Sequence, residues 1–348
     1  MRKPKVPVRS ARCKSLPTEE YDHLVAIDWS KATMAIARLT KQMREPVVIE
    51  TRADLEELKV YLATLRGRTL LTFEETTTAH WLYVELHDSV ERILICDPYR
   101  NRLLVEGPKT DKIDARKLCL LLKAGLLKEV YHSLEEDYHL RKIVSAYDDV
   151  VKAGVRLLNQ RSAFSLADGG ASETEEAHFV CKHLETGIAW YEETKLAYAA
   201  LFAQLRRNDV RIRRLTALPG IADIFATKIV ARVIDARRFP NAAHYLSYCG
   251  LIKHARTSGG RLYGRKSPRY CRTLKAVYKS AAMAALQGNN PMREYYNHLT
   301  GKGVAEHNAR HAVARMLARI SYGILKTATP YQPYLWRDRT KRAEIQCV

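Results

Sequence analysis

The sequence predicts a mixed α/β unit at the N-terminal side, a charged helical segment in the middle, and a mainly α-helical unit at the C-terminal side. Short apolar runs rich in β-branched residues alternate with helical spacing over the first third of the chain. Helical spacing without a convincing strand then covers residues 129–215, and a second compact unit begins near residue 211. The 348 residues are enough for about two domains, each with its own core.

The first unit is predicted to contain strands before and between helices. Its elements are, in order, strands 23–29, 34–39 and 46–51, helix 54–65, strand 69–74, helix 78–91, strand 92–97 and helix 111–122. This order is typical of a mixed α/β layout, and we expect the three leading strands to form a meander.

The other boundaries follow from composition. Residues 1–20 are predicted to be a flexible basic arm, because six Lys and Arg residues precede the first acid, Glu19. We place the α/β domain at 21–128, a helical or coiled-coil segment at 129–210, a C-terminal domain at 211–330 and a tail at 331–348. The helical segment is interrupted by the turn-forming residues 168–173, so we expect a helical hairpin there.

The chain is strongly basic. Its 58 Lys and Arg residues against 38 Asp and Glu residues give a net charge of +20, which indicates a polyanionic partner, most simply nucleic acid. A merely basic soluble enzyme is the alternative. The seven cysteines include no C-x-x-C pair, which favours reduced thiols in a cytoplasm and argues against a disulfide framework or a zinc ribbon. We expect no membrane helix and no secretory signal.

Four carboxylates stand at the ends of predicted elements. Asp28 lies at the end of the first strand, Glu74 ends the fourth, and Asp111 and Asp114 open the last helix on one face. If the first and fourth strands are neighbours, these hard oxygen ligands suit Mg²⁺ or Mn²⁺ in phosphodiester chemistry. The alternative is that they are ordinary strand-end and helix-start acids. Glu75 could be the ligand in place of Glu74, since the sequence does not fix the alternation of the strand to a single residue.

The segment around Pro219 and Gly220 predicts a helix, a tight turn and a second helix. Such a hairpin can point backbone N–H groups at a DNA phosphate, and Lys228 on the second helix adds a positive charge. An ordinary helix–helix corner has the same sequence pattern.

A basic segment at 256–275 contains seven Lys and Arg residues and no acid. Contacts with phosphates would hold DNA without reading its sequence. The candidate contacts are Arg256, Gly259, Arg261, Arg265, Lys266, Arg269 and Arg272. Ser258 lies within this segment before two glycines, so its hydroxyl is a candidate nucleophile. A serine in a glycine-rich loop with no chemical role is the alternative.

Two other patterns carry less weight. His307 and His311 are spaced i, i+4 and could bind a metal ion, but no third ligand is near in the sequence, which favours a solvated or DNA-facing helix surface. The spacing between Gly259 and Ser267 departs by one residue from that of a phosphate-binding P-loop.

These motifs, in this order, resemble the DEDD transposases of bacterial insertion sequences, the bridge-RNA-guided serine recombinases, to which the pilin-gene invertases are related. Val-Ala-Ile-Asp28-Trp-Ser-Lys31 resembles the first acidic strand of the family, and Phe-Glu74-Glu-Thr76 resembles its E-A-T motif. Lys109-Thr-Asp111-Lys-Ile-Asp114-Ala115 is similar to the K-T-D-x-x-D-A signature. The C-terminal matches are Pro219-Gly220-Ile221, Arg256-Thr-Ser258-Gly259, Arg272-Thr-Leu-Lys275, Asn290-Pro-Met-Arg-Glu-Tyr-Tyr296, Gly301-Lys302 and Ala312-Val-Ala-Arg-Met-Leu317.

The sequence departs from the family pattern in three places. Glu75 replaces a small residue, Ala222-Asp223 replaces a second glycine of the hairpin, and the central helical segment matches poorly.

The resemblance implies a RuvC-like, RNase H-type N-terminal domain in which Asp28, Glu74, Asp111 and Asp114 hold a divalent metal ion. It implies that Ser258 attacks DNA and becomes joined to a phosphate, which conserves the bond energy for rejoining. It also implies dimers and tetramers with composite sites, and a structured RNA that pairs with target and donor DNA.

We therefore expect a DNA transposase or recombinase of an insertion sequence, acting on element ends and target DNA in a bacterial cytoplasm at the nucleoid. One alternative is a structure-specific endonuclease of the junction-resolvase type, in which water replaces Ser258 as the nucleophile. Another is a nucleic-acid-binding protein without catalytic activity.

Overall fold

Two compact units make up the protein in a computed structural model that describes residues 18–99, 110–132, 137–167 and 174–333. The first unit contains the described residues up to His132, and the second contains those from Asp137 onward. Most of the predicted arm 1–20, and the predicted tail from residue 334 onward, lie outside the described residues. None of the helices in the described ranges combines the length and apolar character that crossing a membrane requires.

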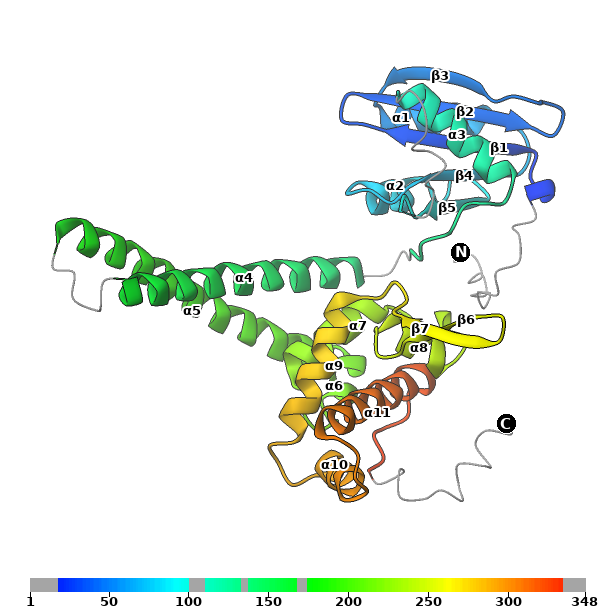
Figure 1. Ribbon diagram of the computed structural model, residues 1–348. Helices are drawn as coiled ribbons and strands as arrows, with labels where there is room; N and C mark the ends of the chain where they lie inside the picture. The colour runs from blue at the N-terminus through cyan, green and yellow to red at the C-terminus, as the bar shows by residue number, and fades with distance from the viewer. Residues whose placement is uncertain (1–17, 100–109, 133–136, 168–173, 334–348) are drawn as a thin grey trace. The chain divides into compact units, whose positions relative to one another are not determined.

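The first unit is built on a five-stranded mixed sheet in the order β3-β2-β1-β4-β5 (Figure 1). The strands β1 (His23–Trp29), β2 (Thr33–Thr40) and β3 (Val47–Arg52) form an antiparallel meander, as the sequence predicted. The strands β4 (Thr69–Glu74) and β5 (Arg92–Cys96) run parallel to β1 on its other side. The first and fourth strands are therefore neighbours, which is the condition for their terminal acids to meet.

Helices cover both faces of this sheet because the apolar side chains alternate between them. On one face α3 (Asp111–Lys123) packs against the even-numbered residues of β1 and β4, such as Leu24 and Leu70. On the other face α1 (Leu55–Thr64) and α2 (Ala79–Leu86) pack against the odd-numbered residues of these two strands, such as Val25. The helix predicted for 78–91 ends at Leu86, because residues 87–91 turn the chain into β5. The fold is compatible with the RNase H-like class.

Two long helices begin the second unit. Helices α4 (Asp137–Ala167) and α5 (Glu175–Asn208) pack side by side, which confirms the predicted helical character of the middle segment (Figure 1). The packing is close, since the Tyr191 ring lies against Gly154. At one end of the pair, Tyr147 and Phe202 enter the core of the second unit, so the long helices are anchored there.

The rest of the second unit is mainly helical, as predicted. Its helices are α6 (Val210–Leu215), α7 (Asp223–Val233), α8 (Ala242–Tyr248), α9 (Arg272–Ala285), α10 (Pro291–Gly301) and α11 (Glu306–Thr327). Single 3-10 turns lie at Ala236–Arg238 here and at Thr18–Glu20 in the first unit. In the core, the hydroxyl groups of Tyr245 and Tyr278 are hydrogen bonded at 2.6 Å, and burial raises the pKa of both phenols.

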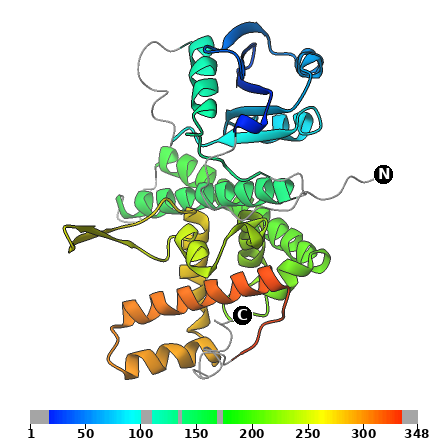
Figure 2. The ribbon, with the colours of Figure 1, turned by 90° about the vertical axis from the view of Figure 1, so that its right-hand side faces the viewer.

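One element of the second unit differs from the sequence prediction. The strands β6 (His254–Ser258) and β7 (Arg261–Lys266) form an antiparallel hairpin where the sequence indicated a loop. Figure 2 shows this hairpin standing away from the helices of its unit. Nearly all of its residues are exposed, so no apolar face marks either strand.

Candidate functional site

The carboxyl ends of β1 and β4 bring two acids together. The two strands are parallel, and their register pairs Ile27 with Phe73, so the next positions along both strands are Asp28 and Glu74. Alternation places Asp28 on the same face as Leu24 and Ala26, and Glu74 on the same face as Leu70. Both acids therefore lie on the face that α3 covers. The sequence predicted only that they can converge at one edge of the sheet if the two strands are neighbours.

Helix α3 begins at this same edge of the sheet. Thr33, just beyond the end of β1, donates a hydrogen bond through its hydroxyl to Asp111 Oδ2 at 3.4 Å. Further along α3, the Cys119 thiol contacts the Leu24 carbonyl oxygen at 3.5 Å, so α3 runs antiparallel to β1. The first turn of α3, which contains Asp111 and Asp114, thus lies where β1 and β4 end.

Local sequence explains why α3 begins here. Thr110 has extended backbone geometry, and its hydroxyl accepts a hydrogen bond from the Ile113 N–H at 3.3 Å, which caps the helix. Acids in the first turn also interact favourably with the helix dipole. An ion pair between Lys112 and Glu50 on β3, at 2.9 Å, holds the same turn against the sheet.

The acidic edge, defined here as Asp28, Glu74, Asp111 and Asp114, has the donor chemistry that Mg²⁺ or Mn²⁺ prefers. Four carboxylates from three elements meet at one end of the sheet. Within residues 18–99, 110–132, 137–167 and 174–333, no three His, Cys, Asp or Glu side chains are gathered closely enough to hold an ion. The carboxylates therefore line the edge without enclosing a single point.

Glu75, the alternative to Glu74 in the sequence, lies in a different environment. Its Oε2 is 2.5 Å from Nε2 of His132, a residue that the sequence analysis did not single out. The His132 side chain is 4% exposed and stacks with His80 of α2. Because α2 covers the opposite face of the sheet from α3, the geometry favours Glu74 over Glu75 as a member of the acidic edge.

Ser258 is the last residue of β6, at the tip of the hairpin. It faces Arg261 across a turn made by Gly259 and Gly260, whose φ angles are 54° and 76°. Two successive positive φ angles are typical of the tightest hairpin turns, and glycine adopts them without strain. Ser258 is exposed, and within the described part of the chain its hydroxyl makes no hydrogen bond.

Basic side chains surround Ser258 on both strands. Arg256 precedes it on β6 and lies over the Tyr263 ring at 5.8 Å, while Arg261, Arg265 and Lys266 belong to β7. Arg269 follows the hairpin and Arg272 opens α9, and both residues are exposed. The predicted phosphate contacts of this segment are therefore accessible to a polyanion.

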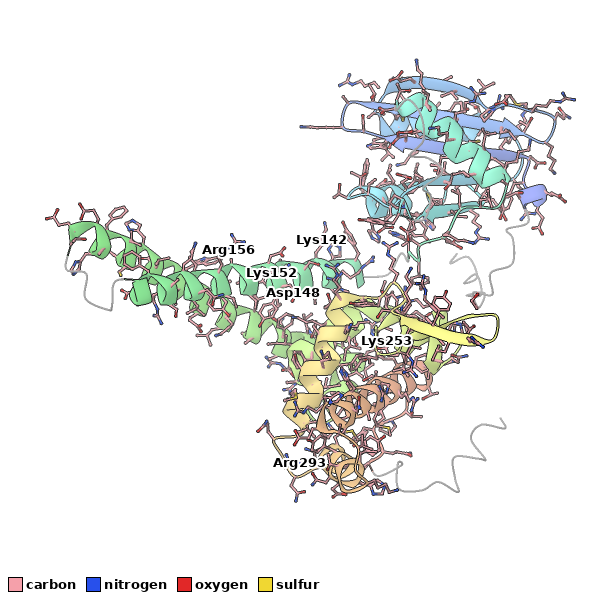
Figure 3. All side chains as sticks on the ribbon, in the orientation of Figure 1. Lys142, Asp148, Lys152, Arg156, Lys253 and Arg293 are labelled. Atoms are coloured by element: carbon pink, nitrogen blue, oxygen red, sulfur yellow. The ribbon has the colours of Figure 1, made fainter. Side chains whose placement is uncertain are left out.

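Gly220 and Lys228, the two residues predicted to bind nucleic acid in the helical hairpin, serve packing in this structure. Gly220 has a φ of 77°, and a Cβ atom there would lie 2.2 Å from the Ala281 carbonyl oxygen of α9. Lys228 is 14% exposed and forms an ion pair at 2.5 Å with Asp148. Figure 3 labels Asp148 on α4.

The N-terminus of α7 is also an unfavourable place for a phosphate. Its first residue is the acid Asp223, which pairs with Arg206 at 3.4 Å. A DNA-binding helix-hairpin-helix is therefore not confirmed, and contacts of Gly220 and Lys228 with nucleic acid stay a prediction.

Positive charge is concentrated in one part of the sequence. Residues 211–330 contain 22 Lys and Arg residues but only four Asp and Glu residues, whereas residues 21–128 contain 17 and 16. The acidic edge thus belongs to a nearly neutral domain, and the serine hairpin belongs to a strongly basic one. Residues 211–330 therefore supply most of the positive charge that can attract a polyanion.

Two family models match the chain. A transposase model named for the DEDD domain of IS110 elements matches residues 25–164, and a model described as the transposase IS116/IS110/IS902 family matches residues 212–297. Both matched regions are those of the IS110/IS116/IS902 transposase family. The first match contains all four acids of the acidic edge, and the second contains the hairpin with Ser258.

Curated relatives of the family are similar to parts or most of the chain. The "Insertion element IS110 uncharacterized 43.6 kDa protein" of Streptomyces coelicolor is 30% identical over 119 residues, 34% of this chain and 29% of that protein. The "Insertion element IS116 uncharacterized 44.8 kDa protein" of Streptomyces clavuligerus is 27% identical over 128 residues, 36% of this chain and 32% of that protein. The matches therefore span less than a third of these two relatives.

A third relative is similar over nearly its full length. The "Transposase for insertion sequence element IS1328" of Yersinia enterocolitica is 23% identical over 337 residues, 88% of this chain and 98% of that protein.

Proposed function

We propose that this protein is a DNA transposase that cuts and rejoins DNA at the ends of an insertion sequence. The observation that carries the proposal is the pair of features in one chain: an acidic edge of metal-ligand type, and a serine presented at the tip of an exposed basic hairpin. The family match and the name of the IS1328 relative support the same conclusion.

The acidic edge is proposed to hold Mg²⁺ or Mn²⁺. Asp28 and Glu74 are fixed by neighbouring parallel strands, and Asp111 and Asp114 by the first turn of α3, so the four carboxylates share one edge of the sheet. Binding of an ion would require their side chains to move closer together than they lie in this structure. When bound, a divalent ion would neutralise charge on the phosphodiester oxygens and on the leaving oxygen. The contribution of the protein is to keep these carboxylates on one edge, where Thr33 and Thr110 fix the start of the helix.

Ser258 is proposed to be the nucleophile. Its Oγ forms a bond to phosphorus, the ester bond from phosphorus to a deoxyribose oxygen breaks, and the freed oxygen takes up a proton. The serine proton passes to a base or to water. Rejoining reverses these steps, since a DNA hydroxyl attacks the phosphoserine and restores Ser258. Arg256 lies two residues before Ser258 on β6, and Arg261 lies opposite it on β7, so both are candidates to stabilise negative charge on the phosphate.

A second candidate is a metal-dependent endonuclease that uses water as the nucleophile. One observation favours it: the described residues supply no hydrogen-bond partner to the Ser258 hydroxyl, and an unactivated serine is a weak nucleophile. In this case Ser258 has only a structural role in the hairpin turn.

We further propose that a structured RNA guides the protein and that dimers or tetramers act on the DNA. The family resemblance is the basis of both statements. The excess of positive charge in residues 211–330 supports binding of more than one nucleic acid, since each backbone needs its own counter-charges.

The test is a denaturing gel of the full chain with end-labelled element DNA, its RNA and Mg²⁺. Ser258→Ala is compared with wild type, and Ser267→Ala, a serine just beyond the same hairpin, is the matched control. A protein–DNA band that survives denaturation in wild type and control but is absent in Ser258→Ala supports the serine mechanism. Free cleaved DNA without this band, equally strong in Ser258→Ala, would establish the water-dependent nuclease instead.

A further inference from the structure

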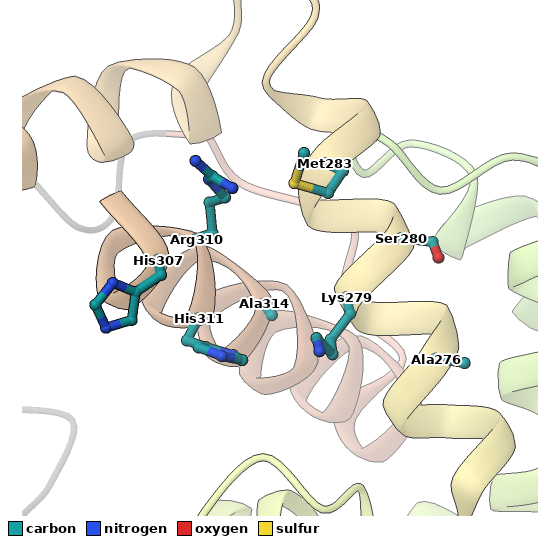
Figure 4. Close-up of a pocket in the computed structure, with 8 residues that line it drawn as sticks. All are labelled: Ala276, Lys279, Ser280, Met283, His307, Arg310, His311 and Ala314. Atoms are coloured by element: carbon teal, nitrogen blue, oxygen red, sulfur yellow. The ribbon is translucent and has the colours of Figure 1, made fainter. Parts of the chain in front are cut away.

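A groove between α9 and α11 gathers basic side chains that the proposed chemistry does not use. Its volume is about 520 Å³. Its lining residues are Ala276, Lys279, Ser280, Met283, His307, Arg310, His311 and Ala314. Figure 4 shows Lys279 of α9 and His311 of α11 directed toward each other across it. The family model ends at residue 297, so the α11 side of the groove lies outside that match.

Positive charge in this groove is poorly compensated. Helix α9 contains no acid, and the one acid of α11, Glu306, is engaged by Arg310 at 2.5 Å. The pKa of His311 is lowered by burial and by four positive or protonatable neighbours, namely Lys279, Arg315, His307 and Lys275. Burial and Arg319 likewise lower the pKa of Arg315.

Crowded like charges are unfavourable in the free protein, and an anion between the helices removes the repulsion. A phosphodiester fits this place better than a metal ion or an apolar ligand. Among the described residues, no third metal ligand joins His307 and His311, and half of the groove lining is basic. Two of the lining residues, Ala276 and Ala314, have small side chains that leave room in the groove beside the charged ones.

We propose that the groove between α9 and α11 binds a backbone phosphate of a nucleic acid, held by Lys279, Arg310 and His311. The proposal rests on the proposed function only in taking nucleic acid as the ligand, because the proposed strand cleavage assigns no step to these residues. It adds a holding site to a chain whose hairpin carries the reacting serine. DNA and RNA share the phosphodiester, so either can be the source.

The first test separates binding from chemistry by using the Ser258→Ala protein in EDTA. Fluorescence anisotropy with short duplex DNA and with the element's RNA is measured over a series of salt concentrations. Lys279→Gln is compared with Lys182→Gln, an exposed lysine of α5 whose loss changes the net charge equally. We expect Lys279→Gln to reduce the slope of log affinity against log salt by about one unit, and Lys182→Gln to leave it unchanged.

The second test follows His311 itself by NMR, with its signal assigned from His311→Gln. A bound phosphate favours the imidazolium, so the pKa of His311 is expected to rise on binding, and affinity is expected to increase as pH falls through this pKa. Titrations with duplex DNA, with the RNA and with poly-glutamate identify the source of the anion.

The outcomes are distinct. An unchanged salt slope in Lys279→Gln, or an unchanged His311 pKa with both nucleic acids, overturns the proposal, and a response to poly-glutamate alone assigns the groove to an acidic protein segment. Because the binding protein lacks Ser258 and metal, these results do not depend on whether the serine mechanism holds.

Discussion

Replacing Gly220 by alanine tests whether its turn is a packing element or a DNA contact. Gly220 has a φ of 77°, and a Cβ atom there would lie 2.2 Å from the Ala281 carbonyl oxygen and 2.8 Å from the Ala285 nitrogen. Both atoms belong to the backbone of α9, so no side-chain rotation relieves the overlap. Either the turn or α9 must move, and we expect the free energy of unfolding to fall.

The size of the effect can be estimated from its two causes. The left-handed backbone conformation costs a residue with a Cβ atom roughly 1 kcal/mol. Overpacking against fixed backbone adds about 2 kcal/mol, so Gly220→Ala is expected to lose about 3 kcal/mol. Gly303 is the matched control, because its φ of 80° is almost the same and no atom lies within 4 Å of its Cβ position. Gly303→Ala is expected to lose only about 1 kcal/mol.

Urea unfolding followed by circular dichroism measures both variants, because the second unit supplies most of the helix. With a slope of about 2 kcal/mol per molar urea, the midpoint is expected to fall by roughly 1.5 M for Gly220→Ala and 0.5 M for Gly303→Ala. Equal midpoints would refute the packing argument. If Gly220→Ala were as stable as Gly303→Ala yet bound DNA more weakly, the turn would be a phosphate contact, as the sequence predicted.

Three further predictions concern single side chains. Asp148→Asn removes the ion-pair partner of Lys228, which is only 14% exposed, so the free energy of unfolding measured in urea is expected to fall by about 2 kcal/mol. The double variant Lys228→Met, Asp148→Leu removes both charges and is expected to stay near wild type. Equal losses in the two variants would contradict this reasoning. Burial raises the pKa of the Cys119 thiol to about 12, so iodoacetamide is expected to label Cys119 far more slowly than the partly exposed Cys181. The contribution of Cys119 to the free energy of unfolding is expected to decrease as pH rises above 9.0, the ordinary pKa of the thiol, because only the unfolded chain then loses the proton. Equal labelling of the two cysteines in mass spectra would refute the burial of Cys119. Asp111→Asn removes a proposed metal ligand, so Mg²⁺-dependent strand cleavage is expected to be abolished while the affinity for DNA stays within about twofold of wild type. Unchanged cleavage on a gel would show that Asp111 is not part of the metal site.

Much of the first unit could be predicted because its strands bury apolar side chains. Strands β1 and β4 have the predicted bounds, and the order of strands and helices around them is as expected. The position of Asp28 and Glu74 follows from these strands once they are neighbours. The sequence did not decide between Glu74 and Glu75, since that choice depends on the face of the sheet and on His132, which is 57 residues away from Glu75.

The serine hairpin was missed for the opposite reason. Strand prediction relies on alternation between a buried and an exposed face, and both faces of β6 and β7 are exposed. The remaining signal was the pair Gly259 and Gly260, which is favoured in two-residue hairpin turns. The ion pair of Lys228 could not be predicted for a different reason. Its partner Asp148 lies 80 residues earlier on another helix, and no local pattern connects the two residues.

The unequal distribution of charge bears on how the proposed reaction is divided within the chain. Carboxylates repel a phosphodiester, so the acidic edge by itself contributes no affinity for nucleic acid and depends on a cation for any favourable contact. Residues 211–330, with 22 basic and four acidic residues, supply the opposite property and need no metal to hold a polyanion. Affinity and metal-dependent chemistry are then separable, so substitutions in the acidic edge should act on the rate of strand cleavage. Substitutions of basic side chains that are given no part in the reaction, such as Lys266 of the hairpin or Lys279 of the groove, should act on binding. A serine on an exposed hairpin fits this division, since the phosphate that it attacks must already be held by the basic side chains around it.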